Sequence, residues 1–497
     1  MKAGSSAGLQ NAWVSVWVRM CVSVWKSARQ ILPLAWPVLV GQLAVLAFST
    51  IDTVMVARYS PLDLAALAVG GATYISVFIG LMGVVLAVGP ITGQLFGAGK
   101  HREAGAQLHQ AVWLALGLSV LGCAVLLFPQ PFLSLAKVQP DVDVKVRGYL
   151  TALAFALPSA LLFTAFRGFN TAVSRPKVVM ALQLGALTLK LPLTALLVFG
   201  ASVNTPWGEW TVAAQGAPGC GVATAVVMAC QLVAAWWVMQ RDPFYERFGL
   251  RARRLDTPHR ASLKELLRLG VPMGLSIGVE VTGFTFMAFF ISRLGATPVA
   301  GHQIAVNLVS LMFMVPLALG NATSTLAAQR IGAGDAAGAR RVGWHGLICG
   351  VGIAAATGSV VFLLRETLLR AYTPNLQIAA VALPLLAWLV VFHIADAAQT
   401  VAAFVLRAYR ITTLPLVIYV LALWGVGLMG GHVLAFDLTG LTPRGLQGAQ
   451  GFWAAATAGL ILAALGLFAV MARTLKLASP GLPPHRPPQT PGLHPSA

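Results

Sequence analysis

Long apolar runs alternate with short polar segments along almost the whole chain. Twelve of these runs are long enough for a helix, which rises about 1.5 Å per residue, to cross a hydrocarbon layer of about 30 Å. They cover residues 31–57, 63–95, 105–128, 147–168, 177–200, 219–239, 265–292, 297–330, 337–363, 376–404, 411–434 and 446–471. The pattern predicts an all-α polytopic membrane protein with twelve transmembrane helices.

A few ionisable residues interrupt this apolar pattern. Asp52, in the segment FSTIDTVMV, lies in the first run, and Lys190 lies in the fifth. Glu280 lies in the seventh run and Asp396 in the tenth. A charged side chain at the centre of a membrane helix costs about 2.5–3.5 kcal/mol on insertion scales, and such residues commonly mark ion or substrate pathways. Each of these four residues is therefore a candidate functional residue.

The composition and the placement of charge support a membrane protein. Charged residues make up 10% of the 497 residues, against about 25% in soluble domains. The mean hydropathy is +0.79. The net charge of +19 would also suit a nucleic-acid-binding protein. With both termini inside, however, 25 of the 34 Lys and Arg fall in the tails, the inner loops and the inner ends of the spans, and eight in the outer loops and outer ends of the spans. This positive-inside distribution predicts cytoplasmic termini and argues against nucleic acid as a partner.

The two halves of the chain resemble each other. When the first half is shifted by 235 residues, Gln94 aligns with Gln329. The triplet GAG at 97–99 likewise aligns with GAG at 332–334. An even number of spans in each half makes these parallel repeats, related by an axis along the membrane normal. We predict two six-helix lobes around a central site, an arrangement that suits alternating access in a transporter.

The same pattern predicts five segments in the chain. Residues 31–240 form an N-lobe with spans 1–6, and residues 265–473 form a C-lobe with spans 7–12. A basic cytoplasmic linker, residues 241–264, joins the lobes. Residues 1–30 are a cytoplasmic segment that is either an interfacial helix or an extension upstream of the true start. Residues 474–497 are a Pro-rich cytoplasmic tail, which we expect to be disordered.

Polar residues gather around the two acids of the C-lobe. His393 and Gln399 lie three residues before and after Asp396, so these side chains can share one face of a helix. Burial and a neighbouring carboxylate both disfavour a bare negative charge. A close Glu280–Asp396 pair would therefore bind Na⁺ or hold a proton. Neither span shows a Lys or Arg near its acid, which favours such a cation site.

The sequence provides little support for an enzyme. The segment GAGKH at 97–101 resembles a phosphate-binding loop, but Gln94 stands where that motif requires its first Gly and His101 where it requires a hydroxyl. We find no ATPase module, no zinc-ligand spacing and no nucleophile motif. We therefore expect no cofactor and no enzymatic activity, and an ion gradient as the source of energy.

Six short sequence motifs resemble those of a known family. They are IDTVMVA at 51–57, TGQLFGAG at 92–99, GCGVATA at 219–225, VEVTGF at 279–284, GHQIAVNLVSLMFMVP at 301–316 and IADAAQTVAAFVLRAYR at 394–410. From about residue 31 to 473 the chain is similar to the MATE (multidrug and toxic compound extrusion) family, in its bacterial NorM-like branch. The resemblance implies a twelve-helix antiporter that expels cationic amphiphilic drugs and dyes in exchange for Na⁺ or H⁺.

The resemblance also implies roles for individual residues. Asp52 in the N-lobe, with Glu280 and Asp396 in the C-lobe, occupies the positions of the family's coupling acids, and the C-lobe pair would hold Na⁺ if the protein is sodium-coupled. Further candidates for the substrate site or its lining are Lys190, Thr194, His302, Gln303, Phe392, His393 and Gln399. A structural hydrogen bond is the simpler interpretation for a single intramembrane His.

Three positions depart from the family pattern. Relatives commonly carry Asn where Lys190 and Thr194 stand in span five. Phe392 replaces a Tyr that the close branch often has four residues before the span-ten acid. That replacement removes a hydroxyl ligand from the expected cation site.

Asp52 and Lys190 are predicted to lie at similar depths. Asp52 is about six residues and Lys190 about ten residues from the outer ends of their spans, so their depths differ by roughly 6 Å. A Lys side chain can bridge that difference. An internal ion pair would offset the burial of both charges. The alternative is that Asp52 titrates freely while Lys190 extends into the cavity.

The leading functional hypothesis is a secondary active multidrug exporter in a bacterial inner membrane, acting as a monomer embedded in the lipid bilayer. A lipid-linked oligosaccharide flippase of the same superfamily is an alternative, but it would need several deep Lys or Arg to bind a pyrophosphate. A membrane-embedded enzyme or receptor is a third possibility, and it would explain neither the repeat nor the buried acids. The sequence does not specify the physiological substrate or the choice between Na⁺ and H⁺.

Overall fold

The computed structural model describes residues 4–136, 139–205, 208–251 and 255–477. In the first half the elements are α1 (Gly4–Tyr59), α2 (Pro61–Val85), α3 (Val88–Gly97), α4 (His101–Leu127), α5 (Gln130–Ala136), α6 (Pro140–Ala172), α7 (Pro176–Phe199), β1 (Ala201–Thr205), β2 (Gly208–Val212), α8 (Ala217–Arg241) and η1 (Pro243–Phe248). In the second half they are α9 (Arg260–Ser292), α10 (Ala296–Gly332), α11 (Ala336–Leu363), α12 (Arg365–Tyr372), α13 (Leu376–Ala408), α14 (Thr413–Tyr419), η2 (Val420–Met429), α15 (Gly430–Ala435), η3 (Arg444–Leu446) and α16 (Ala449–Leu477).

The described residues contain 12 helical segments long and apolar enough to cross a membrane, and they coincide with the predicted spans. The twelve-helix fold class is therefore confirmed. Two of these segments are interrupted: span two is α2 followed by α3, and span eleven is α14, the π-helical η2 and α15. Proline starts several helices at its first position, where its missing N–H costs nothing, as at Pro61, Pro140 and Pro176.

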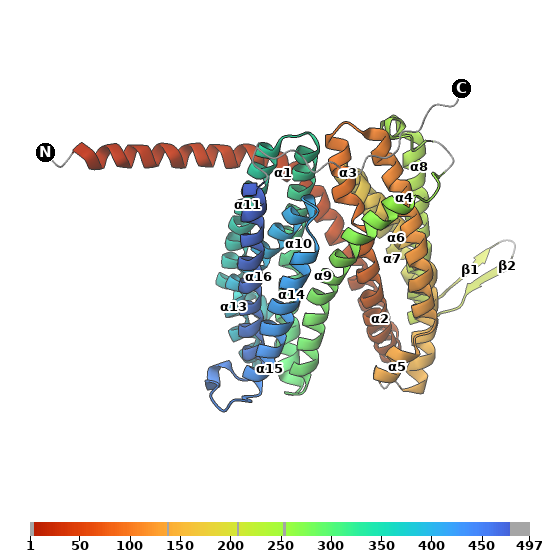
Figure 1. Cartoon of the computed structure of the whole chain (residues 1–497). Coiled ribbons are helices and arrows are strands. Elements are labelled where there is room, and N and C mark those ends of the chain that lie inside the picture. Colours follow the sequence, from red (N-terminus) through yellow and green to blue (C-terminus); the bar gives the residue numbers. More distant parts are fainter. Residues whose placement is uncertain (1–3, 137–138, 206–207, 252–254, 478–497) are drawn as a thin grey trace, which may run out of the picture.

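The structure differs from the expected pattern in two places. Helix α1 runs without a break from Gly4 to Tyr59, so the first span continues the segment predicted as separate. A short antiparallel hairpin, β1 and β2, joins α7 to α8 (Figure 1). The hairpin lies in a loop between spans, where apolar periodicity gives no signal. The predicted tail falls largely on residues 478–497, which lie outside the described residues.

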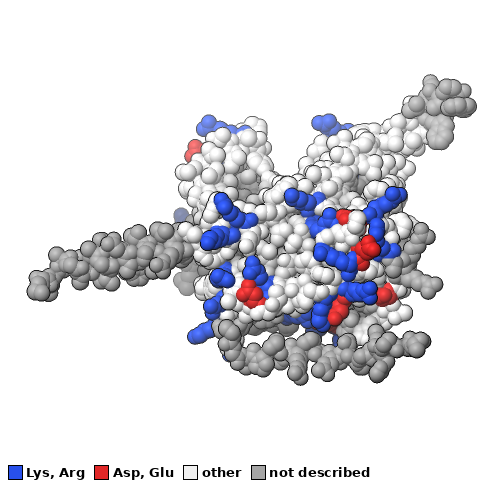
Figure 2. Space-filling view, turned by 90° about the horizontal axis from the view of Figure 1, so that it is seen from above, with Lys and Arg blue, Asp and Glu red and all other residues white. Residues whose placement is uncertain are grey.

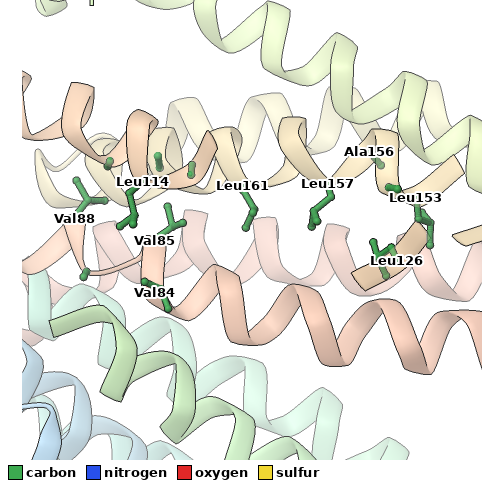
Figure 3. Close-up of a cluster of buried hydrophobic side chains, with 14 of the residues drawn as sticks. Val84, Val85, Val88, Leu114, Leu126, Leu153, Ala156, Leu157 and Leu161 are labelled. Carbon is green, nitrogen blue, oxygen red and sulfur yellow. The ribbon is translucent and has the colours of Figure 1, made fainter. Parts of the chain in front are cut away.

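The N-lobe helices pack around an aliphatic core. Val85 of α2, Leu114 of α4 and Leu157 of α6 lie in one buried cluster (Figure 3). Shape complementarity drives this packing in lipid, because the surrounding acyl chains are as apolar as the side chains themselves. The core holds the lobe as a unit and fixes the helices on which its polar residues lie.

The two halves meet near one end of the molecule and diverge toward the other, where α5 and α15 lie apart (Figure 1). Ile31 and Ala35 of α1 pack against Ala318 and Leu319 of α10 in a buried cluster. Figure 2 looks onto the end at which the halves meet and shows numerous Lys and Arg side chains there. This is the surface to which the sequence assigned the inner loops.

Two equivalent glutamines hydrogen-bond across the halves at this end. The Gln94 side-chain amide donates to the Ala408 carbonyl at 2.8 Å. The Gln329 side-chain amide donates to the Ala172 carbonyl at 2.7 Å and to Ser174 Oγ at 2.8 Å. The internal repeat therefore places the same side chain in the same role from each half, since Gln94 and Gln329 were aligned in sequence. We call these two hydrogen-bonded contacts the glutamine latch.

Glycine is required beside the latch. A Cβ atom on Gly97 would lie 1.9 Å from the Gln329 carbonyl oxygen, and one on Gly332 would lie 1.9 Å from that of Gln94. Both obstructing atoms belong to helix backbone, which cannot move aside as a flexible side chain can. The repeated GAG triplets thus permit α3 and α10 to touch, and they are not remnants of a phosphate-binding loop.

We predict that Gly97→Ala forces this contact apart and lowers the melting temperature of the purified protein. Overpacking of this kind typically costs about 1–3 kcal/mol. Gly117→Ala is the matched control, because a Cβ at Gly117 meets nothing within 4 Å. Thermal unfolding in detergent compares the two variants. Equal melting temperatures of the two variants would contradict the close backbone approach of α3 and α10 at Gly97.

Candidate functional site

The two acids of the C-lobe lie on neighbouring helices and share one amide. Glu280 comes from α9, whereas Asp396 and Gln399 lie one turn apart on α13. The Gln399 side-chain nitrogen donates to Asp396 Oδ1 at 2.9 Å and lies 3.4 Å from Glu280 Oε1. The sequence predicted that these side chains would meet, and the structure brings them together through Gln399.

Hydroxyl groups complete this cluster. The Tyr419 hydroxyl of α14 donates to the side-chain oxygen of Gln399, and Thr400 Oγ1 lies 3.0 Å from its nitrogen. Tyr419, Gln399 and Asp396 are all buried. A tyrosine hydroxyl from another helix thus belongs to the cluster, while position 392 carries a Phe. Sequence analysis missed Tyr419, although a Tyr in an apolar span commonly has a polar partner.

An apolar pocket of about 470 Å³, partly open to its surroundings, adjoins Glu280. It is lined by Glu280, Gly283, Phe284, Met287, Phe392, Leu423, Gly427, Leu428, Ala456 and Leu460. The Phe284 and Phe392 rings meet edge to face with centroids 6.1 Å apart. An aromatic and aliphatic wall with one carboxylate is a suitable environment for a delocalised cation.

One cation near these acids contradicts the sequence analysis, which expected no Lys or Arg close to either one. Helix α13 continues to Ala408, beyond the predicted end of the span, and therefore includes Arg407. A long side chain in a helix leans toward the helix N-terminus, so Arg407 can approach the polar cluster. It lines a second space of about 200 Å³ together with Tyr419, and its guanidinium carbon lies 4.3 Å from the Phe404 ring centroid.

The remaining C-lobe candidates have different surroundings. His302 is buried, and its Nδ1 accepts a hydrogen bond from the Trp453 indole N–H at 3.2 Å. His393 is buried, and neither ring nitrogen has a hydrogen-bond partner. Phe392 packs against Trp453 as well as lining the pocket. Gln303 is exposed and is not among the residues that line these two spaces, so its place in a cavity lining stays a prediction.

The N-lobe contains the ion pair that the sequence left as one of two alternatives. Lys190 Nζ of α7 lies 2.9 Å from Asp52 Oδ1 of α1, and the Lys190 side chain is 0% exposed. The contact is close in distance, but Asp52 Oδ1 does not receive a hydrogen bond of normal geometry. The charges therefore compensate each other directly, as burial in a membrane requires.

Further groups surround the Lys190 ammonium. It donates to Thr224 Oγ1 at 2.5 Å, and the Phe48 ring centroid lies 5.9 Å away. Thr194, one turn further along α7, is fully buried, and its hydroxyl has no hydrogen-bond partner. The sequence did not identify Thr224, which comes from α8 within the word GCGVATA.

The two sites differ in their free oxygen donors. The N-lobe carboxylate has an ammonium of the chain beside it. In the C-lobe the Gln399 side-chain nitrogen lies between two carboxylates, and its oxygen accepts from the Tyr419 hydroxyl. Hard cations such as Na⁺ prefer oxygen donors. Among the described residues no group of three or more His, Cys, Asp or Glu side chains could hold a metal ion.

Comparisons with known proteins agree with this architecture. The MatE family model matches residues 37–196 and again residues 272–433, once in each half. The chain is 40% identical over 433 residues to a probable multidrug resistance protein NorM of Aromatoleum aromaticum, covering 87% of this chain and 91% of that protein. It is 33% identical over 449 residues to the multidrug resistance protein PmpM of Pseudomonas aeruginosa, covering 90% and 92%.

A solved structure shares the fold at low sequence identity. It is described as the outward-facing conformation of a multidrug resistance MATE family transporter of the MOP superfamily. Its TM-score is 0.79 at 16% sequence identity, and the match covers 91% of this chain and 96% of that chain. The fold class inferred from the apolar pattern is therefore shared with known transporters.

We predict that Asp52 and Lys190 show strong non-additivity. Asp52→Asn or Lys190→Asn alone leaves a buried charge unpaired, at a cost of about 3–5 kcal/mol, and should impair expression or thermal stability. The double variant Asp52→Asn/Lys190→Asn should recover folding, because it leaves no lone charge. Fluorescence-detected size exclusion and melting temperatures of the four proteins measure this cycle.

Lys100→Asn is the control for this cycle. Its side chain is 55% exposed in an ion pair with Glu103, so its loss should change stability little. Strictly additive losses in the double variant would contradict direct coupling of Asp52 and Lys190.

Proposed function

The chain belongs to the MatE family, and we propose on that basis that it is a multidrug efflux transporter that exports cationic amphiphilic compounds in exchange for Na⁺ or H⁺. The family consists of transporters and not enzymes, and relatives from bacteria are multidrug resistance proteins by name. The twelve-span chain therefore works in a bacterial inner membrane. The observation that best supports the mechanism is the Glu280–Gln399–Asp396 cluster beside an apolar pocket.

The position of Glu280 supports competition between a drug and the coupling ion. Glu280 lines the apolar pocket and also lies within hydrogen-bonding reach of Gln399 in the polar cluster. A cation in the cluster neutralises the carboxylates, which removes the attraction for an organic cation in the pocket. An organic cation in the pocket has the converse effect, as reciprocal coupling between sites requires. Such competition is the basis of antiport.

A cationic substrate follows from the nature of the pocket. Delocalised cations lose water at low cost and bind favourably to aromatic faces. The pocket offers the rings of Phe284 and Phe392 and the carboxylate of Glu280. A flippase for pyrophosphate-linked sugars would need exposed cations there, and none of the residues lining this pocket is Lys or Arg.

The glutamine latch supports an outward-open state. The basic end of the molecule, where the latch lies, would face the cytoplasm under the positive-inside rule. The halves then diverge toward the periplasm (Figure 1). Alternating access would require both glutamine contacts to break when the protein opens inward.

We predict that Glu280→Gln or Asp396→Asn abolishes gradient-driven efflux while the protein still folds. The amide variants keep the shape of each side chain but remove the charge that holds the coupling cation. Ethidium efflux from proteoliposomes measures transport, and Glu103→Gln is the control because its side chain is 57% exposed. Full transport by both single variants would exclude the C-lobe acids as the coupling site.

The proposed function itself is tested with the purified wild type. Proteoliposomes loaded with ethidium receive an opposing Na⁺ gradient in one arm and a H⁺ gradient in another. One of the two gradients should drive ethidium movement and thereby identify the coupling ion, while an anionic dye of similar size should not move. Transport of the anionic dye in preference to ethidium would contradict the proposal.

A further inference from the structure

Two cations at the basic end of the N-lobe lie beside exposed tryptophans. Lys177 is the second residue of α7, and its Nζ lies 6.0 Å from the ring centroid of Trp36 in α1. Arg241 is the last residue of α8, and its guanidinium carbon lies 5.6 Å from the ring centroid of Trp237. Trp36 is 46% exposed and Trp237 is 56% exposed. Both indoles are therefore available to a partner outside the packed helices.

An ion pair brings the ends of these two helices together. Arg175, two residues before Lys177, pairs with Asp242, which directly follows α8. Helix α7 also packs against both α1 and α8. Lys177 and Arg241 therefore lie on neighbouring helix ends, with one indole beside each. We call the following four residues the tryptophan–cation patch: Trp36, Lys177, Trp237 and Arg241.

The carboxylates beside the patch are already paired. Asp242 belongs to the ion pair just described, and Glu246 Oε2 accepts a hydrogen bond from Arg251 Nη1 at 2.9 Å. Across the described part of the chain, neither Lys177 nor Arg241 forms an ion pair, and both residues are exposed. The patch therefore presents two uncompensated positive charges to its surroundings.

The internal repeat shows that the fold does not require this patch. Under the shift of 235 residues, Trp36 aligns with Val271. Lys177 and Thr413 each lie five residues after the alanine whose carbonyl accepts a hydrogen bond in the glutamine latch. At the corresponding positions the C-lobe thus has an aliphatic side chain and a hydroxyl in place of an indole and an ammonium. A structural role common to both lobes does not explain the N-lobe residues.

The chemistry of the patch is complementary to an anionic phospholipid. The patch lies at the ends of two membrane-spanning helices, α7 and α8. Trp side chains concentrate at the membrane–water interface, with the amphipathic ring at the level of the headgroups. Basic side chains beside membrane helices attract anionic lipid headgroups. The patch combines both kinds of side chain on adjacent helices.

We propose that the tryptophan–cation patch binds an anionic phospholipid of the leaflet that surrounds the basic end. Lys177 and Arg241 contact the phosphate oxygens, and Trp36 and Trp237 contact the glycerol and the upper part of the acyl chains. This lipid stabilises the packing of α1, α7 and α8 at the end where the glutamine latch also lies. The inference adds a binding site to the proposed function and does not depend on which compound is transported.

Native mass spectrometry of the detergent-purified protein tests this binding. The protein is incubated with equal amounts of phosphatidylglycerol and phosphatidylcholine that have the same acyl chains. The wild type should bind phosphatidylglycerol in preference. Lys177→Gln or Arg241→Gln should each weaken phosphatidylglycerol binding about fivefold, because one basic side chain near an anionic headgroup contributes about that factor. The double variant Lys177→Gln/Arg241→Gln should lose the preference.

The double variant Arg293→Gln/Arg365→Gln is the matched control. These arginines also lie over aromatic rings, with guanidinium carbons 5.2 Å and 4.1 Å from the ring centroids of Phe289 and Phe362. They lie at the opposite end of the spans, directly after α9 and at the start of α12. The control removes the same number of positive charges and should keep the lipid preference of the wild type.

Equal binding of the two lipids by the wild type would overturn the proposal. Unchanged preference in the folded Lys177→Gln/Arg241→Gln variant, or an equal loss in the control, would overturn it as well, because the site would then lie elsewhere. Displacement of phosphatidylglycerol by glycerophosphoglycerol, which lacks acyl chains, would indicate a site for a soluble phosphate compound and contradict a lipid site. If the double variant does not fold, the wild type and the two single variants decide. The ethidium assay remains a separate test of the proposed function.

Discussion

The constraint on which this structure depends is that a charge buried among membrane helices must be compensated nearby. Lys190 illustrates it, because its ammonium is fully buried and lies against Asp52 and Thr224. The C-lobe instead places two acids, Glu280 and Asp396, around one side-chain amide of Gln399. Under the proposed exchange mechanism, a coupling cation compensates these two acids. Two lobes that share one fold thus differ in a small number of ionisable side chains.

The internal repeat joins the two lobes through equivalent contacts. The glutamine latch uses Gln94 and Gln329 in equivalent positions, and Gly97 and Gly332 let the helices approach closely enough to form it. The two contacts are equivalent by the internal repeat, so opening at the basic end would require both of them to break. Helix α13 carries Asp396 and Gln399 as well as the Ala408 carbonyl that accepts from Gln94, so it connects the C-lobe cluster to the glutamine latch.

The sequence predicted the twelve spans because helix length and apolarity are local properties. It also predicted that Asp52 and Lys190 could meet, since depth follows directly from residue count. It did not reveal Arg407, because the apolar run fades before α13 ends and side-chain direction cannot be derived from composition. Tyr419 and Thr224 were missed because they reach their sites from helices whose rotation depends on packing. Gln303 is exposed, and its assignment to a cavity lining stays a prediction.

The central claim is that ethidium and the coupling ion compete for the carboxylates of the C-lobe, Glu280 and Asp396, and equilibrium binding tests it most directly. Ethidium binding to the detergent-purified wild type, followed by fluorescence anisotropy, gives an apparent Kd at a series of concentrations of the coupling ion. Reciprocal linkage predicts that log Kd rises with the logarithm of ion concentration toward a slope of about one. A Kd that does not change with either Na⁺ or H⁺ would contradict the account.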